Sequence, residues 1–132
     1  MRCLLVFTRL VCLTRINFLC GLKDIVGFTA WSSERSPVDV FTLLETIYGR
    51  FDELAQKRGV FKVETIGDCY VAVTGVPEPR KDHAVIMAKF ARDMLEALEE
   101  ELLKLELVLG KETSNLAMRV GKYLMMQVVP TI

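Results

Sequence analysis

The clearest pattern along the chain is a helical stripe of apolar residues in its first half. Apolar side chains recur every three or four positions, which places them on one face of an α-helix. These positions are Val40, Leu44, Ile47, Phe51 and Leu54. Ser36 can cap the start, Pro37 suits the first helical position, and Asp39 completes an acidic variant of the capping box. Gly59 can end the helix, so we expect a helix from Pro37 to the residue before Gly59, with one face buried against a sheet.

Two β-prone runs follow this helix, Val60 to Ile66 and Cys69 to Thr74. Gly67-Asp68 between them fits the two-residue turn of a β-hairpin. Strict alternation sorts the first run onto two faces: Phe61, Val63 and Thr65 on one, and Lys62, Glu64 and Ile66 on the other, which Val71 and Val73 share. The second face mixes charged and apolar side chains, as a subunit interface or a ligand site does. Lys62 itself is expected to face solvent or to form a salt bridge.

The remaining elements complete an alternating pattern. A strand is expected from Ile16 to Leu22, leading into Asp24, and a long helix from about Asp82 to about Leu107, with Asp82 as its N-cap. Gly75-Val76-Pro77-Glu78-Pro79 is expected to be a loop, and Leu116 to Val120 a last strand. The order strand, helix, hairpin, helix, strand predicts an α+β fold of the ferredoxin-like kind, with an antiparallel sheet and helices on one side.

Composition and charge narrow the possible roles. The 132 residues suit one small domain, and the formal net charge of zero gives no support for nucleic-acid or membrane-surface binding. The first 22 residues are mostly apolar, but Arg9 and Arg15 interrupt them, so no run approaches the roughly 20 residues of a membrane span. The four cysteines match no C-x-x-C pattern. We therefore expect a cytoplasmic chain with reduced thiols and no direct membrane span; a targeting peptide at the N-terminus is the alternative.

Two segments combine a carboxylate with a glycine turn. Asp24-Ile25-Val26-Gly27-Phe28-Thr29 has one carboxylate before a glycine loop, and Lys62-Val63-Glu64-Thr65-Ile66-Gly67-Asp68-Cys69-Tyr70 places two on and just past a strand. Carboxylates beside free backbone N–H groups suit divalent metal ions and phosphates. Asp68 alone would be an ordinary turn residue and Asp24 alone a helix cap, whereas the two motifs together point to a nucleotide as the ligand.

These two motifs together resemble the class III nucleotidyl cyclase catalytic domain, the family of adenylyl and guanylyl cyclases. The resemblance covers about Asp24 to Met94, including Gly75-Val76-Pro77-Glu78-Pro79 and Asp82-His83-Ala84, and is weaker at Leu116-Ala117-Met118-Arg119-Val120-Gly121. It implies formation of a 3′,5′-cyclic nucleotide and pyrophosphate from a nucleoside triphosphate, with two Mg²⁺ or Mn²⁺ ions.

The resemblance also implies roles for individual residues. Asp24 and Asp68 would bridge the metal ions, with the Ile25 carbonyl as a further ligand. The backbone N–H groups of the segment Gly27, Phe28 and Thr29 would contact phosphate oxygens. Glu64 lies where the family reads the purine, and a carboxylate there can accept the N1 and N2 hydrogens of guanine, so GTP is favoured over ATP.

The chain departs from the family pattern at both ends of the resemblance. Lys23 is a charged residue directly before the first aspartate, where it could weaken metal binding by repulsion. After Gly121 the chain reads Lys122-Tyr123-Leu124-Met125-Met126, and the family's later asparagine and arginine have no matching position. We therefore expect an N-terminal extension over residues 1–15, a partial catalytic domain over 16–121 and a non-family tail over 122–132.

These departures leave several outcomes open. Loss of transition-state groups predicts little turnover by the truncated chain alone, since each lost donor commonly costs about 10²- to 10³-fold in rate. The family's active sites form between two domains, so the expected partner is a second cyclase domain in a homodimer or heterodimer. Adenylyl cyclase activity, or a non-catalytic fragment that acts as a dimerisation or regulatory module, are the alternatives. An uncovered sheet edge and apolar helix surface are also expected.

Overall fold

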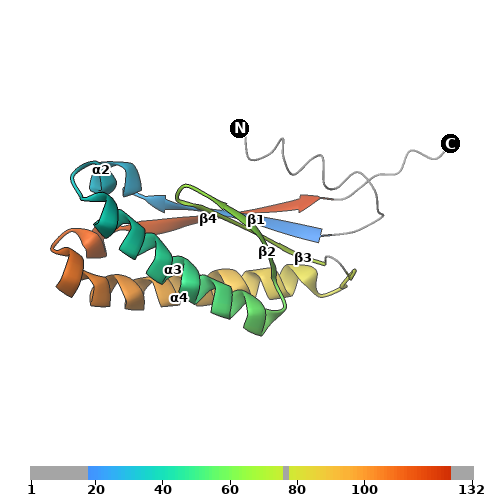
Figure 1. The fold of residues 1–132 in the computed structure, drawn as a ribbon. Coiled ribbons are helices and arrows are strands. Elements are labelled where there is room, and N and C mark those ends of the chain that lie inside the picture. The colour runs from blue at the N-terminus through green and yellow to red at the C-terminus, as the bar shows by residue number, and fades with distance from the viewer. Residues whose placement is uncertain (1–17, 76–77, 126–132) are drawn as a thin grey trace.

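One antiparallel sheet carries two long helices on one of its faces (Figure 1). The computed structural model describes residues 18–75 and 78–125. Its elements in chain order are β1 (Phe18–Val26), α2 (Phe28–Ser33), α3 (Pro37–Arg58), β2 (Phe61–Ile66), β3 (Cys69–Thr74), α4 (His83–Leu109), the 3₁₀ turn η1 (Thr113–Asn115) and β4 (Ala117–Met125). The strand order is β2-β3-β1-β4, with every pair antiparallel. The predicted α+β fold with helices on one side is confirmed.

Helix α3 begins and ends where its local chemistry predicts. The Ser36 side chain accepts a hydrogen bond from the Asp39 N–H at 3.2 Å, and Pro37 occupies the first turn. Gly59 has a φ of 67°, and its N–H reaches the carbonyls of Ala55 and Gln56. The expected stripe faces inward: Ile47 and Phe51 are fully buried, Leu54 is nearly so, and Val40 and Leu44 pack against the core while partly exposed.

Helix α4 starts directly after Asp82, as predicted, but Asp82 does not cap it with its side chain. The Asp82 carboxylate instead accepts two hydrogen bonds from Arg80, at 3.1 and 3.2 Å. The helix runs to Leu109, two residues past its expected end. Arg58 at the end of α3 bonds to Asp93 of α4 at 2.7 Å, so the two helices are tied together by an ion pair as well as by packing.

The hairpin has the predicted two-residue turn, but strict alternation along β2 is wrong. Ile66 pairs with Cys69 and Glu64 with Val71, whereas Lys62 pairs with Ala72, so a β-bulge lies between Lys62 and Glu64. The extra residue inverts the faces of all positions before it. Phe61 therefore shares the face of Val73, and Lys62 turns to the helix side, away from Glu64 and Ile66.

The outer parts of the expected strands also differ from the structure. Strand β1 continues through Asp24 to Val26 instead of ending at Leu22, and Ile16 lies outside the described residues. The short helix α2 replaces the loop expected after Gly27. Strand β4 continues past the expected end at Val120 to Met125. The tip of the predicted loop, Val76-Pro77, and residues 126–132 lie outside the description.

The core lies between the sheet and the two long helices. Its largest fully buried side chains come from α3, β3 and α4, and include Leu43, Phe51, Tyr70, Met87 and Phe90. The expected uncovered apolar helix surface is present, since Leu103, Leu107 and Val108 of α4 are 63%, 89% and 77% exposed. Among the described residues, no helix combines the length and the apolar character that crossing a membrane requires.

Candidate functional site

The first candidate carboxylate, Asp24, lies directly opposite Arg119 on the neighbouring strand β4. The Arg119 guanidinium donates two hydrogen bonds to it, from Nε to Oδ1 at 3.2 Å and from NH2 to Oδ2 at 2.6 Å. Residues directly opposite in an antiparallel pair have their side chains on the same face of the sheet. This pair is partly open to solvent, with the Asp24 side chain 38% exposed.

The second candidate carboxylate, Asp68, lies in the turn next to this pair. Pairing of β1 with β3 ends at Lys23 and Tyr70, and one further step along the same register would bring Asp24 opposite Cys69, the residue after Asp68. Strands in a sheet are about 4.8 Å apart, so the β2–β3 turn lies beside this end of β1. The pKa of Arg119 is raised first by its hydrogen bonds to Asp24, and the charge of Asp68 adds to this effect.

The turn that carries Asp68 is supported from below by an aromatic side chain. The Tyr48 hydroxyl on α3 donates to the Gly67 carbonyl oxygen at 3.2 Å. Tyr48 is 8% exposed and packs against Tyr70, with ring centroids 5.6 Å apart. Burial raises the pKa of the Tyr48 phenol, with the nearby Asp68 charge as the next cause. The phenol therefore stays neutral and can hold the turn across the physiological pH range.

Glu64 lies on the same face of the sheet as Asp24, two strands away. It pairs with Val71, Val71 pairs with Leu22, and Leu22 is two residues before Asp24. Ideal strand spacings put the Cα atoms of Glu64 and Asp24 about 12 Å apart. Glu64 is partly exposed. The face opposite the helices therefore presents Asp24, Arg119 and Glu64 together.

Lys62 does not take part in this arrangement. Its ammonium group bonds to the Asp52 carboxylate of α3 at 2.9 Å and lies 5.4 Å from the centre of the Tyr70 ring. The Tyr70 hydroxyl donates to the same carboxylate at 2.8 Å. The salt bridge expected of Lys62 is thus present, on the helix side of the sheet.

The predicted phosphate-contacting residues form the passage from β1 into α2. Gly27 has a φ of 84°, and its carbonyl accepts the Trp31 N–H at 3.0 Å, so the chain turns into the helix immediately after the strand. The first N–H groups of a helix have no partner within the helix. The backbone N–H groups of Phe28 and Thr29 belong to this first turn, a few residues beyond Asp24.

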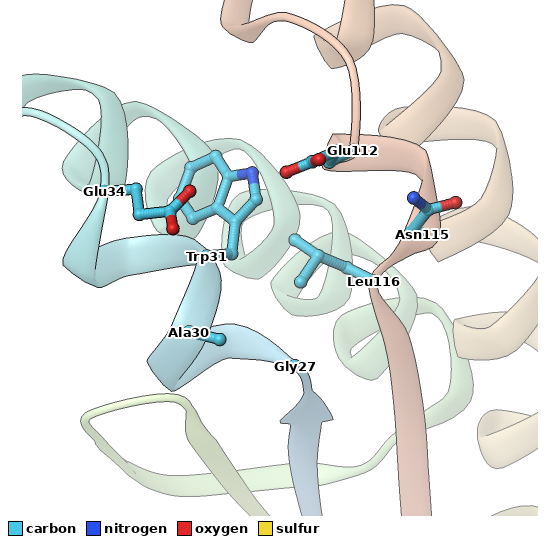
Figure 2. Close-up of a pocket in the computed structure, with 7 residues that line it drawn as sticks. All are labelled: Gly27, Ala30, Trp31, Glu34, Glu112, Asn115 and Leu116. Atoms are coloured by element: carbon cyan, nitrogen blue, oxygen red, sulfur yellow. The ribbon is translucent and has the colours of Figure 1, made fainter.

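A cavity of about 260 Å³ lies between α2 and the segment before β4 (Figure 2). It is lined by Gly27, Ala30, Trp31, Glu34, Glu112, Asn115 and Leu116. Trp31 is 7% exposed, and its indole N–H donates to Thr113 Oγ1 at 3.3 Å. The cavity shares only Gly27 with the predicted site, so it does not contain the candidate carboxylates.

The donor set fits a hard divalent ion only in part. Two carboxylates and a backbone carbonyl are oxygen ligands of the kind that Mg²⁺ binds, with water completing its octahedron. Within residues 18–75 and 78–125, no group of three or more His, Cys, Asp or Glu side chains is placed to hold a metal. Asp24 and Asp68 could therefore hold such an ion with water and phosphate oxygens as its other ligands, once Asp24 is released from Arg119.

Sequence reasoning missed two residues of this arrangement. Arg119 was expected only as part of a strand, although a charged residue within a short β-prone run signals an exposed face. Tyr48 lies next to Ile47 of the helical stripe and gives no separate signal. Each acts on its partner through a contact that depends on strand register or helix packing.

Comparison with known proteins identifies the family of this chain. Residues 19–123 match the family model described as the adenylate and guanylate cyclase catalytic domain. An adenylate cyclase of Mycobacterium tuberculosis is 46% identical over 71 residues, which is 54% of this chain and 16% of that protein. The chain therefore belongs to the adenylate and guanylate cyclase catalytic domain family, as the resemblance predicted.

Solved structures of guanylyl cyclase domains share the fold. The guanylate cyclase domain of RhGC from Catenaria anguillulae, solved in complex with GTP, superposes with a TM-score of 0.69 at 33% identity, over 82% of this chain and 56% of that one. A dimeric guanylyl cyclase domain of RhoGC from Blastocladiella emersonii gives 0.68 at 33%, over 81% and 56%. This chain thus spans little more than half of each solved chain.

Proposed function

We propose that this chain contributes the metal-binding half of a guanylyl cyclase active site, in which GTP is converted to cGMP and pyrophosphate. One observation carries the proposal: Asp24 of β1 and the turn bearing Asp68 lie at the same end of the sheet, in a chain that belongs to the cyclase family. Membership leaves the nucleotide open, since relatives include an adenylate cyclase and guanylate cyclases.

The proposed roles are those that the family resemblance implies. The Asp24 and Asp68 carboxylates and the Ile25 carbonyl would hold two Mg²⁺ or Mn²⁺ ions. When bound, such ions lower the pKa of the ribose 3′-hydroxyl and neutralise triphosphate charge. The N–H groups of the segment 27–29 orient the phosphates. The 3′-oxygen then attacks the α-phosphorus, and pyrophosphate leaves.

Glu64 is the proposed guanine reader. Its carboxylate can accept hydrogen bonds from N1–H and N2–H of guanine, whereas adenine would leave the carboxylate unpaired. Because family sites form between two domains, the partner that completes the site is a second cyclase domain, in a homodimer or heterodimer.

Turnover of GTP and ATP with Mn²⁺ tests the enzymatic role. The purified chain is measured alone and mixed with an intact cyclase domain whose own metal-binding aspartates are replaced. Cyclic product in the mixture that Asp68→Asn in this chain abolishes supports the proposal. The matched control is Asp39→Asn, which removes a partly exposed carboxylate at the start of α3 and should leave product unchanged. Equal product from Asp68→Asn would exclude the metal role of Asp68.

Glu64→Lys tests the purine assignment separately. We expect the ratio of GTP to ATP turnover in the mixture to fall by at least about tenfold, because a lysine cannot accept the guanine hydrogens. Glu78→Lys is the control. It makes the same charge change at an exposed residue between β3 and α4. A ratio that moves equally in both variants would show that Glu64 does not read the base.

A regulatory module is the second candidate function. It is favoured by the pairing of Asp24 with Arg119, which occupies both oxygens of the candidate ligand. In this case the chain binds a complete cyclase domain and changes its rate without turnover dependent on Asp68. The same mixing experiment distinguishes the two functions, since only the first is abolished by Asp68→Asn.

A further inference from the structure

The contact between Arg119 and Asp24 has the geometry of a forked ion pair. Two guanidinium nitrogens meet the two carboxylate oxygens, at 2.6 and 3.2 Å. Paired N–H···O bonds of this kind engage both oxygens at once and fix the carboxylate orientation. Both oxygens of the proposed metal ligand Asp24 are therefore already in contact with a cation.

The backbone holds this contact in place. Asp24 and Arg119 are direct partners in the β1–β4 ladder, with Lys23 opposite Val120 and Ile25 opposite Met118 on either side. The two side chains therefore start from adjacent positions on one face of the sheet. Little conformational entropy is lost when they come together. The pair is 95 residues apart in sequence and exists only because these strands are neighbours.

A second carboxylate, that of Asp68, lies in the turn beside this end of β1. Asp24 and Asp68 would repel each other in the absence of a cation. Through its contact with Asp24, Arg119 supplies positive charge at the position where a divalent ion is proposed to bind.

We propose that Arg119 is an internal counter-cation that occupies Asp24 in the metal-free chain and must leave it before a divalent ion can bind. The inference rests on the proposed metal role of Asp24. An ion and a guanidinium compete for the same oxygens and also repel each other. The pair is exposed, with the Arg119 side chain 73% accessible, and exposed pairs are weak enough for displacement. Arg119 is in this sense a positioning residue that sets metal affinity.

Direct titration with Mn²⁺ in the absence of nucleotide tests this competition. We expect Arg119→Gln to bind Mn²⁺ roughly threefold to tenfold more tightly than the unaltered chain. Arg119→Lys retains the charge but lacks the fork, so its affinity should lie between the two. Arg50→Gln is the matched control, because Arg50 is paired with Glu53 on α3. This substitution removes one positive charge away from Asp24.

A second measurement separates competition from a purely structural role. The thermal midpoint of Arg119→Gln should fall without metal, because Asp24 loses its counter-cation, and it should rise further on adding Mn²⁺ than in the unaltered chain. If Arg119 only joined the strands, the midpoint would fall equally with and without Mn²⁺. That equal fall, in a variant whose circular dichroism is unchanged, would overturn the inference.

The outcomes distinguish this inference from the proposed function. The counter-cation role alone is overturned if Asp24→Asn abolishes Mn²⁺ binding while Arg119→Gln leaves it unchanged or weakens it. Mn²⁺ binding that survives Asp24→Asn overturns the metal assignment, and the competition falls with it. Tighter binding in Arg119→Gln, lost again in the double variant with Asp24→Asn, supports both.

Discussion

Tyr48 and Gly67 are joined by a hydrogen bond of 3.2 Å from the phenol to the carbonyl oxygen. This contact ties the middle of α3 to the two-residue turn between β2 and β3. Because Asp68 follows Gly67 directly, the position of the candidate ligand depends on a helix that carries none of the proposed ligands. The aromatic group of Tyr48, Phe51 and Tyr70 under the hairpin, with ring centroids 5.6 to 6.2 Å apart, keeps the phenol in place.

Tyr48→Phe should therefore weaken Mn²⁺ binding while lowering the free energy of unfolding by only about 0.5–1.5 kcal/mol, the usual contribution of one hydrogen bond. Urea unfolding and Mn²⁺ titration measure the two effects. Tyr70→Phe is the control, because the Tyr70 hydroxyl donates to Asp52 of α3. Equal Mn²⁺ affinity of the two variants would show that the Tyr48 contact does not position Asp68.

Stability should depend on acid pH through Asp93. Hydrogen bonding from Arg58 lowers the pKa of the Asp93 carboxyl, with Arg92 adding to the effect. A lowered pKa in the folded state stabilises the fold above the unfolded value of about 3.9, and this stabilisation is lost as pH falls through the folded pKa. We expect Asp93→Asn to lose roughly 1–3 kcal/mol of unfolding free energy at pH 7.

The pH series supplies the check on this prediction. Below about pH 4 the difference between Asp93→Asn and the unaltered chain should shrink, since the carboxyl of the unfolded chain is then protonated while the folded one is protonated only as pH falls through its lowered pKa. Glu96→Gln is the control, because Glu96 is 68% exposed and lies 3.9 Å from Arg92; its effect should stay within about 0.5 kcal/mol. A constant difference from pH 7 to pH 2 would contradict the assigned role of the Asp93 charge.

Two phenylalanines of α3 should respond very differently to truncation. Phe51 is fully buried in the core, whereas Phe41 is 67% exposed. Phe51→Ala should cost about 3–5 kcal/mol of unfolding free energy through lost burial and a cavity, comparable with the entire stability of many small domains. Phe41→Ala should change it by less than about 0.5 kcal/mol. Chemical denaturation of the two variants compares them directly, and similar losses would refute the packing of α3.

Two glycines should give opposite results on replacement by alanine. Gly27 has a φ of 84°, and a Cβ there would meet only Leu116 at 3.6 Å, an ordinary contact, so backbone strain decides the outcome. Gly27→Ala should destabilise by roughly 1–2 kcal/mol. Gly49 lies within α3 with no other atom within 4 Å of an added Cβ, so Gly49→Ala should stabilise by about 0.8–1 kcal/mol. Thermal unfolding measures whether each variant is more or less stable than the unaltered chain. A stability change of the same sign in both variants would argue against the turn into α2.

Local chemistry explains why α3 could be predicted to the residue. Ser36, Asp39 and Gly59 act on backbone groups within a few positions of themselves, so their effect is readable without the rest of the fold. The two-residue turn at Gly67-Asp68 is similarly local. The identity of the candidate carboxylates, Asp24 and Asp68, was accessible for a different reason, because their flanking motifs are family patterns.

The sequence pattern did not predict the β-bulge in β2. Its position between Lys62 and Glu64 depends on how β2 meets β3 and on the attraction of Lys62 to Asp52 beneath the sheet. Strict alternation takes no account of a partner on another element, so it placed Lys62 and Glu64 on one face of the sheet. The bulge separates them, and Glu64 remains on the face that carries Asp24.

By itself, the sequence determined the two long helices, the hairpin turn, the candidate ligands and the family, because each depends on neighbouring residues or on contiguous motifs. Only the tertiary structure decided which charges meet. Arg119 and Asp24 are 95 positions apart, and Tyr48 and Gly67 are 19 apart. Strand register and helix packing bring them into contact, and both follow from burial of the whole core. The state of the candidate metal site is therefore a property of the assembled sheet.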